Sequence, residues 1–327
     1  MASLHTTPND YRTHRYWQQY QPFFPEDARI TDANAPDEEH FLWRGAALHL
    51  DRFACATTPL TVILVHGGGG YGRLFAPLAR LLHQAGYEVL APDLPGYGLS
   101  VAAHELISYH AWVDAVCDLA RADYARHGRR VVLFGGSLGG YLAYLCAARL
   151  GSTICAGVIA TTLADPRSAL VQQRFARNAL VQHLMLPLLP WLTPWFGRLR
   201  LPIKWFSRMH AMSGNPALNR IVAADPYGGS ARVPVSFMHS IFTVQPALEP
   251  EQFDICPVLL VQPAADSWTN LACSKPFFDR IKARKKLVML DNCGHFPVEQ
   301  PGVTQLEQAA LQFLQEVAAT HAAATHA

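Results

Sequence analysis

Serine, histidine and aspartate residues stand in this chain where they could perform nucleophilic chemistry. Ser137 lies in a Gly-x-Ser-x-Gly pattern, Gly135-Gly136-Ser137-Leu138-Gly139, behind the apolar run 130–133. A buried strand that turns sharply into a helix lifts such a serine out of the sheet edge, and glycines permit the turn. The start of the helix also lies close to where negative charge would develop. Ser137 is therefore the predicted nucleophile.

The serine needs a base that takes its proton and a third group that orients the base. After a turn of this kind, the partners follow in the order serine, acid, histidine. His295 stands just after the last predicted strand, in Cys293-Gly294-His295-Phe296, and Asp266 follows the strand before it. Asp165, just past an earlier strand, is the alternative acid. We prefer Asp266 because it fits the expected order and placement, and both carboxylates stay in consideration.

Acyl transfer also needs two backbone N–H groups that face the oxygen on which charge develops. The first is expected from Leu138, the residue after the nucleophile. The second is expected from the glycine run 67–70, at Gly68 or at Gly69, where the backbone can approach a substrate closely. The same run could cradle a phosphate, but no Gly-Lys-Ser/Thr follows it, so that interpretation fails.

The spacing of the remaining chemistry-bearing residues predicts neither a metal site nor a cofactor. The sequence has no His-Glu-x-x-His and no cluster of Cys and His. The loop 95–98, Pro-Gly-Tyr-Gly, lacks the spacing of a dinucleotide-binding glycine motif. The seven cysteines are scattered without a Cys-x-x-Cys pair, which argues against a disulfide framework and for a reducing compartment.

Composition limits the class of protein further. Half of the 327 residues are apolar and the net charge is +2, which predicts a large core and no strong attraction to nucleic acid or anionic membranes. Residues 1–10 contain no apolar stretch of the kind found in signal peptides, and no apolar run reaches the roughly 18 residues of a membrane span. We expect a cytoplasmic protein without a transmembrane segment or a nucleic-acid partner, and leave the oligomeric state open.

The elements that must position these residues alternate between strands and helices. Strands are predicted at 41–44 and 47–50 (both at a sheet edge), 60–65, 87–94, 130–133, 154–161, 257–261 and 286–290; helices are predicted at 74–85, 112–127, from 138, at 275–282 and at 305–318, before a frayed tail over 319–327. Such alternation predicts an α/β fold with a mostly parallel central sheet and helices on both faces. Ligands on such sheets bind at the carboxyl ends of the strands, where the candidate residues converge.

The chain divides into three parts at this level. Residues 1–37 form an N-terminal extension, rich in aromatic residues, that packs on the body; 38–164 and 254–327 form the core; and 165–253 interrupt the alternation as an inserted, mainly helical cap. The cap stretch 184–196 is apolar and so rich in proline that only short helices are expected. Its large side chains form either the cap's own core or an apolar pocket above the serine.

Together these patterns resemble the α/β-hydrolase superfamily, in particular its capped serine esterases, lysophospholipases and monoacylglycerol-lipase-like members. The resemblance covers about 41–318 and rests on Leu64-Val65-His66-Gly67-Gly68, Asp93-Leu94-Pro95-Gly96-Tyr97-Gly98-Leu99-Ser100, Gly135-Gly136-Ser137-Leu138-Gly139-Gly140, Asp266 and Cys293-Gly294-His295. Two departures stand out: Gly136 before the serine, where many members carry a larger side chain, and the absence of glycine before Asp266.

The leading hypothesis is a serine hydrolase that cleaves a small-molecule carboxylic ester with a bulky or acyl-chain apolar group through an acyl-enzyme on Ser137. The same residues would serve an acyltransferase, a peptidase or a carbon–carbon hydrolase, because specificity depends on the cap. A non-catalytic ligand-binding protein on a hydrolase scaffold is the alternative of another class.

Overall fold

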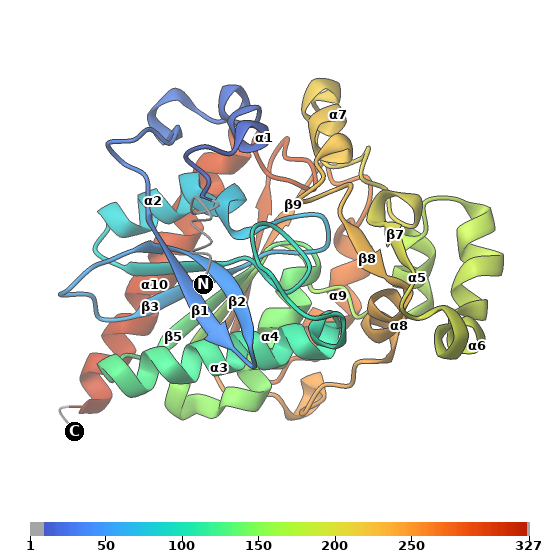
Figure 1. Ribbon diagram of the computed structural model, residues 1–327. Helices are drawn as coiled ribbons and strands as arrows, with labels where there is room; N and C mark the ends of the chain where they lie inside the picture. The colour runs from blue at the N-terminus through green and yellow to red at the C-terminus, as the bar shows by residue number, and fades with distance from the viewer. Residues whose placement is uncertain (1–9, 326–327) are drawn as a thin grey trace, which may run out of the picture.

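An eight-stranded sheet runs through the centre of the molecule (Figure 1). The computed structural model describes residues 10–325; residues 1–9 of the predicted extension and 326–327 of the predicted tail lie outside this range. The strand order is β1-β2-β4-β3-β5-β6-β9-β10. The strands span β1 Asp37–Trp43, β2 Ala46–Phe53, β3 Thr61–Val65, β4 Glu88–Pro92, β5 Val131–Gly135, β6 Cys155–Ala160, β9 Val258–Pro263 and β10 Lys285–Leu290.

The sheet is parallel from β4 to β10 and antiparallel at its first edge. β1 pairs antiparallel with β2, and β2 pairs antiparallel with β4, whereas β3, β5, β6, β9 and β10 run parallel to their neighbours. This confirms the predicted fold class. The strand predicted at 47–50 is not at the edge, however, because β1 covers its free side and β4 pairs with its other side.

Helices cover both faces of the sheet, and the residues of β3, β4, β5, β6 and β9 are all buried between them. α3 and α4 pack together on one face, while α2 and α10 contact each other on the opposite face (Figure 1). The core helices span α2 Ala76–Gln84, α3 Tyr109–His127, α4 Leu138–Ile154, α9 Leu271–Arg280 and α10 Gly302–Thr325, with short turns at η3 Gly72–Phe75, η4 His104–Leu106 and η7 Pro250–Gln252. The last helix runs to Thr325 and so extends into the tail predicted to fray.

The segment between β6 and β9, which we propose as the cap, is mostly helical. It contains α5 Ala169–Phe175, η5 Val181–Met185, α6 Leu186–Phe196, β7 Arg200–Pro202, η6 Ile203–Trp205, α7 Pro216–Ala224, β8 Arg232–Pro234 and α8 Val235–Thr243. α6 passes through Pro190 and Pro194 instead of ending at them. Both prolines are exposed, so solvent can bond the carbonyls that they leave without a partner.

The N-terminal segment packs on the core through its aromatic residues. It contains α1 Arg15–Gln18, η1 Gln21–Phe23 and η2 Glu26–Ala28. Tyr11, Trp17 and Tyr20 are fully or almost fully buried, and Tyr11 stacks on Tyr71 of the core at a centroid distance of 5.3 Å. Burial of aromatic side chains contributes strongly to packing, so these residues explain why this polar segment is ordered.

Candidate active site

Ser137 occupies the turn between β5 and α4 in a strained backbone conformation, with φ 55° and ψ −126°. The flanking glycines are required by close backbone contacts. A Cβ on Gly135 would lie 2.0 Å from the carbonyl oxygen of Gly139, and one on Gly139 would lie 2.1 Å from that of Val65. The Ser137 N–H donates to the Thr161 hydroxyl at 2.9 Å, which ties the turn to the end of β6. The strain thus presents the serine side chain at the sheet edge.

His295 connects Ser137 with Asp266. Its Nε2 lies 2.6 Å from Ser137 Oγ, and its Nδ1 lies 2.8 Å from Asp266 Oδ2. The histidine and the aspartate are almost fully buried, with exposed fractions of 4% and 3%. The Trp268 ring packs against the His295 ring at a centroid distance of 4.6 Å. This geometry allows the imidazole to accept a proton from the serine while Nδ1–H points at a carboxylate.

The loop after β9 holds Asp266 as an ion. Its Oδ1 accepts the backbone N–H groups of Trp268 at 2.8 Å and Thr269 at 2.9 Å. Burial raises the pKa of Asp266, but the charge and hydrogen bond of His295 and the two backbone N–H groups outweigh it, so the pKa lies below its usual value. The Thr269 hydroxyl lies 2.9 Å from Asp266 Oδ2 and 3.0 Å from His295 Nδ1, a contact that the sequence reasoning missed.

Asp165, the alternative acid, is engaged elsewhere. Both of its carboxylate oxygens bond Arg167, at distances of 2.7 to 3.0 Å, and Arg167 also pairs with Glu249 at 2.7 Å. The structure therefore places Asp266, and not Asp165, at Nδ1 of His295. The missing glycine before Asp266 does not prevent this placement.

The glycine run after β3 lies directly against the serine turn. A Cβ on Gly67 would lie 2.9 Å from the Gly136 carbonyl oxygen and 3.0 Å from the Leu138 nitrogen. Burial lowers the pKa of His66 to about 4, so its ring is neutral. Its Nδ1 bonds the Gly67 carbonyl at 2.8 Å, and its Nε2 accepts the Leu94 N–H at 2.9 Å. His66 thereby holds the loop next to the Ser137–Leu138 turn.

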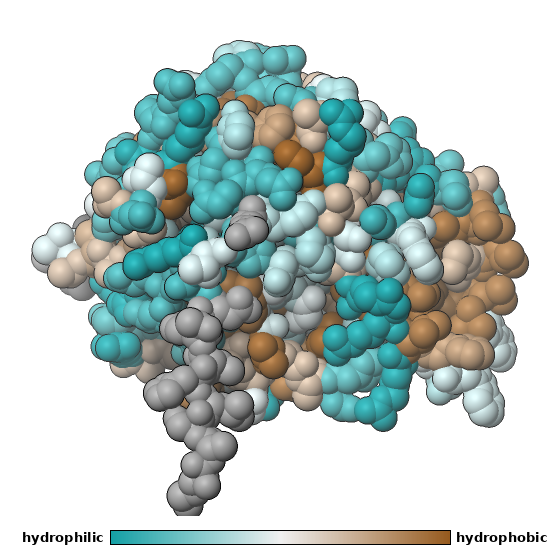
Figure 2. Space-filling model, turned by 45° about the horizontal axis from the view of Figure 1, so that its top comes forward, coloured by the Kyte–Doolittle hydropathy of each residue, from teal (hydrophilic) through white to brown (hydrophobic). Residues whose placement is uncertain are grey.

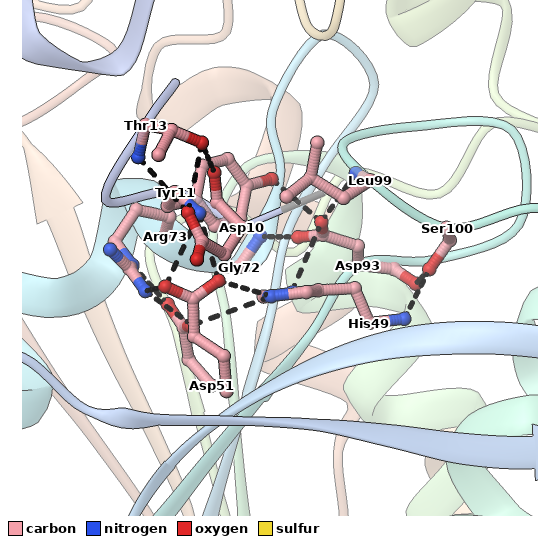
Figure 3. A network of polar contacts seen from close by, with 11 residues as sticks. Asp10, Tyr11, Thr13, His49, Asp51, Gly72, Arg73, Asp93, Leu99 and Ser100 are labelled. Carbon is pink, nitrogen blue, oxygen red and sulfur yellow. Dashed lines mark hydrogen bonds and ion pairs between the residues drawn. The ribbon is translucent and has the colours of Figure 1, made fainter. Parts of the chain in front are cut away.

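A buried polar network fixes the other end of this loop (Figure 3). Asp93 Oδ1 accepts the N–H of Gly72 at 2.7 Å, and its Oδ2 accepts the Tyr11 hydroxyl at 2.6 Å. Arg73 pairs with Asp51 and with Glu38. The network therefore joins the N-terminal segment, the glycine loop and the loop after β4.

The described residues offer two groups of side chains of the kinds that bind metals. They are Glu38, His49 and Asp51 in the network, and Glu88, Asp123 and His127. In the first group Arg73 already pairs with both carboxylates, and in the second Arg52 and Arg129 pair with Glu88. Guanidinium groups at Glu38 and Asp51 in the first group, and at Glu88 in the second, already supply positive charge there, so we assign no metal to either group.

Two mainly apolar cavities meet at Ser137 and Gly68. The first contains about 1060 Å³ of empty space, and the second about 620 Å³. The first is lined among others by Phe24 and Pro25 of the N-terminal segment, Phe75, Phe296 and Leu306; the second by Val171, Phe175, Ile203, Met209 and Trp268. Apolar walls with a few polar groups at one point are typical of ligand sites. The aromatic residues of the N-terminal segment were the only sequence signal for its part in the first cavity.

The comparisons with known proteins agree with this architecture. The alpha/beta hydrolase family matches residues 62–304, more than half of the chain, so the protein belongs to that family. Monoglyceride lipase of Homo sapiens is 34% identical over 137 residues, and the thermostable monoacylglycerol lipase of Bacillus sp. (strain H-257) is 38% identical over 64 residues. The matches cover 40% and 20% of this chain, but only 44% and 26% of those relatives.

Solved structures extend the similarity of the fold over most of the chain. Monoacylglycerol lipase of Paleococcus ferrophilus has a TM-score of 0.65 at 24% identity, covering 83% of this chain and 99% of that one. A soluble variant of monoglyceride lipase from Saccharomyces cerevisiae has a TM-score of 0.71 at 15% identity, covering 90% and 98%. The family match thereby confirms the predicted resemblance to the α/β-hydrolase superfamily, and the partial sequence matches are to monoacylglycerol lipases.

Proposed function

We propose that the protein is a serine hydrolase that cleaves carboxylic esters carrying an acyl chain or another bulky apolar group. The observation that carries this proposal is the contact of His295 with both Ser137 and Asp266 at the meeting point of two apolar cavities. The names of the relatives, monoacylglycerol lipases, support an acyl ester as substrate. The scattered cysteines support our further proposal of a cytoplasmic location.

The proposed reaction has two halves. Ser137 Oγ attacks the ester carbonyl carbon while His295 Nε2 takes its proton, and the negatively charged oxygen is bound by the N–H groups of Leu138 and Gly68, with Gly69 as the alternative donor. His295 then gives the proton to the departing alcohol oxygen, leaving the acyl group on Ser137. Water attacks this acyl-enzyme, loses a proton to His295, and the acid leaves as Ser137 Oγ regains that proton. Asp266 stabilises the imidazolium in both halves.

The two cavities support an ester whose groups on both sides of the carbonyl are accommodated by apolar walls. One cavity would receive the acyl chain and the other the alcohol part. Leu306 lines the first and Val171 the second, and each is 6% exposed. Leu306→Trp and Val171→Trp should narrow one cavity each. The variant that shortens the preferred acyl chain, measured on p-nitrophenyl esters of graded length, identifies the acyl side; no change in either variant contradicts this assignment.

Labelling with a fluorophosphonate, followed by peptide mapping, tests the mechanism. We expect modification of Ser137 that is lost in His295→Ala and retained in His210→Ala, a variant of an exposed histidine. Ser137→Ala should lower turnover of a p-nitrophenyl ester by orders of magnitude with an unchanged melting temperature. A folded wild-type protein that is not labelled, or a fully active Ser137→Ala variant, would contradict the proposal and favour a binding protein.

A further inference from the structure

The N-terminal segment reaches the candidate active site through its second half. Phe24, Pro25 and Ala28 line the first cavity, which also borders Ser137 and His295. The segment lies outside residues 62–304, which match the hydrolase family. The wall that it supplies is therefore an addition to the part of the chain that matches the family.

The Phe24 ring is held between two aromatic neighbours. Its centroid lies 5.8 Å from that of the Trp17 ring and 6.4 Å from that of the Phe296 ring, to which it stands edge-on at 90°. Phe296 follows His295 in the chain and lines the same cavity. Only 6% of Phe24 is exposed. A buried ring that is packed on two sides has little freedom to change rotamer, so Phe24 forms a rigid part of the cavity wall.

Buried hydrogen bonds hold the segment to the core and to the proposed cap. The Tyr11 hydroxyl donates to Asp93 Oδ2 at 2.6 Å, and the Tyr20 hydroxyl donates to Asp225 Oδ2 at 2.9 Å. Asp93 belongs to the loop after β4, whereas Asp225 lies between β6 and β9. Both carboxylates are 0% exposed, and breaking either bond would leave a buried polar group without a partner, which is unfavourable. These bonds therefore keep the segment in place on both sides of the cavity.

The turn that carries Phe24 is also closed locally. Gln21 Nε2 donates to the Ile30 carbonyl at 3.0 Å, and Gln21 Oε1 accepts the Ile30 N–H at 3.1 Å. Glu26 and Asp27 within this turn are exposed, and the upper part of the molecule, where the segment lies, is mainly hydrophilic in Figure 2. Among residues 10–325, no helix is long and apolar enough to cross a membrane. The turn thus directs its polar side to solvent and Phe24 to the cavity.

We propose that Phe24 is a specificity-determining residue, whose ring limits the length of the apolar chain that the first cavity admits. The inference rests on the proposed function, since the chain belongs to an ester bound at Ser137. A longer chain would have to displace a ring packed against Trp17 and Phe296, and overfilling a packed site is unfavourable. A smaller residue at position 24 would leave space that joins the existing cavity, and each further methylene that enters this space leaves water.

Two series of esters test the limit on the full chain. The p-nitrophenyl esters from acetate to palmitate vary the acyl chain, and the alkyl acetates from ethyl to dodecyl acetate vary the alcohol part. Phe24→Ala should move the preferred length of one series upward, and this should be the series in which Leu306→Trp shortens it. Each methylene newly admitted should raise kcat/KM about fourfold, which corresponds to about 0.8 kcal/mol per buried methylene. The other series should keep its preferred length.

Phe23→Ala is the matched control, because Phe23 is the neighbouring phenylalanine and is not among the residues that line either cavity. It should keep the wild-type preference in both series. Thermal unfolding shows which variants are folded. Should Phe24→Ala fail to fold, Phe24→Leu removes less of the side chain and should give a smaller shift in the same direction.

Three results would overturn the proposal. Folded Phe24 variants with an unchanged preference, beside an active wild type, would refute the limit and leave the proposed function standing. An equal shift in Phe23→Ala would refute it too, because loosening of the whole segment, and not the ring at position 24, would then set the length. A folded wild type that cleaves no ester of either series would contradict the proposed function, and the limit with it.

Discussion

The choice between two carboxylates gives the sharpest test of the site, with the variants Asp266→Asn and Asp165→Asn. In Asp266→Asn the side-chain oxygen can still accept the backbone N–H groups of Trp268 and Thr269. The amide NH₂ then faces His295 Nδ1, which is 2.8 Å from the carboxylate oxygen in the wild type. A donor at this place forces Nδ1 to accept and moves the imidazole proton to Nε2. The nitrogen that lies 2.6 Å from Ser137 Oγ can then no longer accept the serine proton.

The expected loss in kcat for Asp266→Asn is about 10⁴-fold, as for a triad whose histidine is held in the wrong tautomer. This corresponds to about 5.4 kcal/mol of transition-state stabilisation at 1.36 kcal/mol per tenfold. Asp165→Asn should leave kcat unchanged, because Asp165 bonds Arg167, and Arg167 keeps its pair with Glu249.

The assay is steady-state hydrolysis of p-nitrophenyl butyrate by both variants and the wild type. Thermal unfolding of each protein shows whether the fold is intact. A large loss in Asp165→Asn together with an active Asp266→Asn would refute the assignment. Equal losses in two folded variants would show that the distances at His295 do not determine which carboxylate acts as the acid of the triad.

Three further outcomes are expected. Thr269→Val removes a hydroxyl that lies 2.9 Å from Asp266 Oδ2. It should lower kcat at least about tenfold with little change in KM, since a hydrogen bond to a charged group contributes about 1.5–3 kcal/mol. Thr269→Ser should restore kcat, and an unchanged kcat in Thr269→Val would exclude a positioning role. Gly139→Ala places a Cβ 2.1 Å from a backbone oxygen, whereas the new Cβ of Gly45→Ala meets nothing within 4 Å. Urea unfolding should show that Gly45→Ala lowers the free energy of unfolding by about 1–2 kcal/mol, because of its positive φ alone, and that Gly139→Ala lowers it by more. Equal losses in the two variants would contradict the close contact at Gly139. Burial lowers the pKa of His49, but the hydrogen bond to Glu38 and the surrounding carboxylates outweigh burial and raise the pKa above its ordinary value of 6.5. The protonated ring therefore stabilises the fold fully below pH 6.5, and this contribution is lost as pH rises through the raised pKa. The free energy of unfolding should fall between pH 6 and pH 9 more in the wild type than in His49→Gln, and parallel curves for the two proteins would refute this.

Much of the candidate site was predictable because its signals are local. The serine turn needs Gly135 and Gly139 within two residues of Ser137, and the structure shows the contacts that exclude a side chain there. His295 could be placed because the carboxyl ends of parallel strands share one edge of the sheet. The alternation of apolar strands and amphipathic helices likewise predicted the fold class, since period and burial are written in neighbouring residues.

Other features depend on contacts between residues far apart in the chain. Asp165 and Asp266 both follow strands, and only the packing of Arg167 against Asp165 and of His295 against Asp266 separates them. Thr269 gives no local signal, because a threonine in a loop is ordinary until a histidine lies next to it. The place of β2 inside the sheet equally depends on which strand pairs with its far side.

By itself, then, the sequence determined the serine turn, the histidine, the parallel sheet and the membership of the family, because each follows from the order and spacing of neighbouring residues. Only the tertiary structure decided which acid faces His295, that Phe24 lines the first cavity, and that Trp191 and Trp195 face solvent. The physical reason is that the free energy falls when an apolar side chain leaves water, whether it enters a core, a pocket or the surface of a partner. Its own residue type does not say which of these it will meet; the packing of the rest of the chain does.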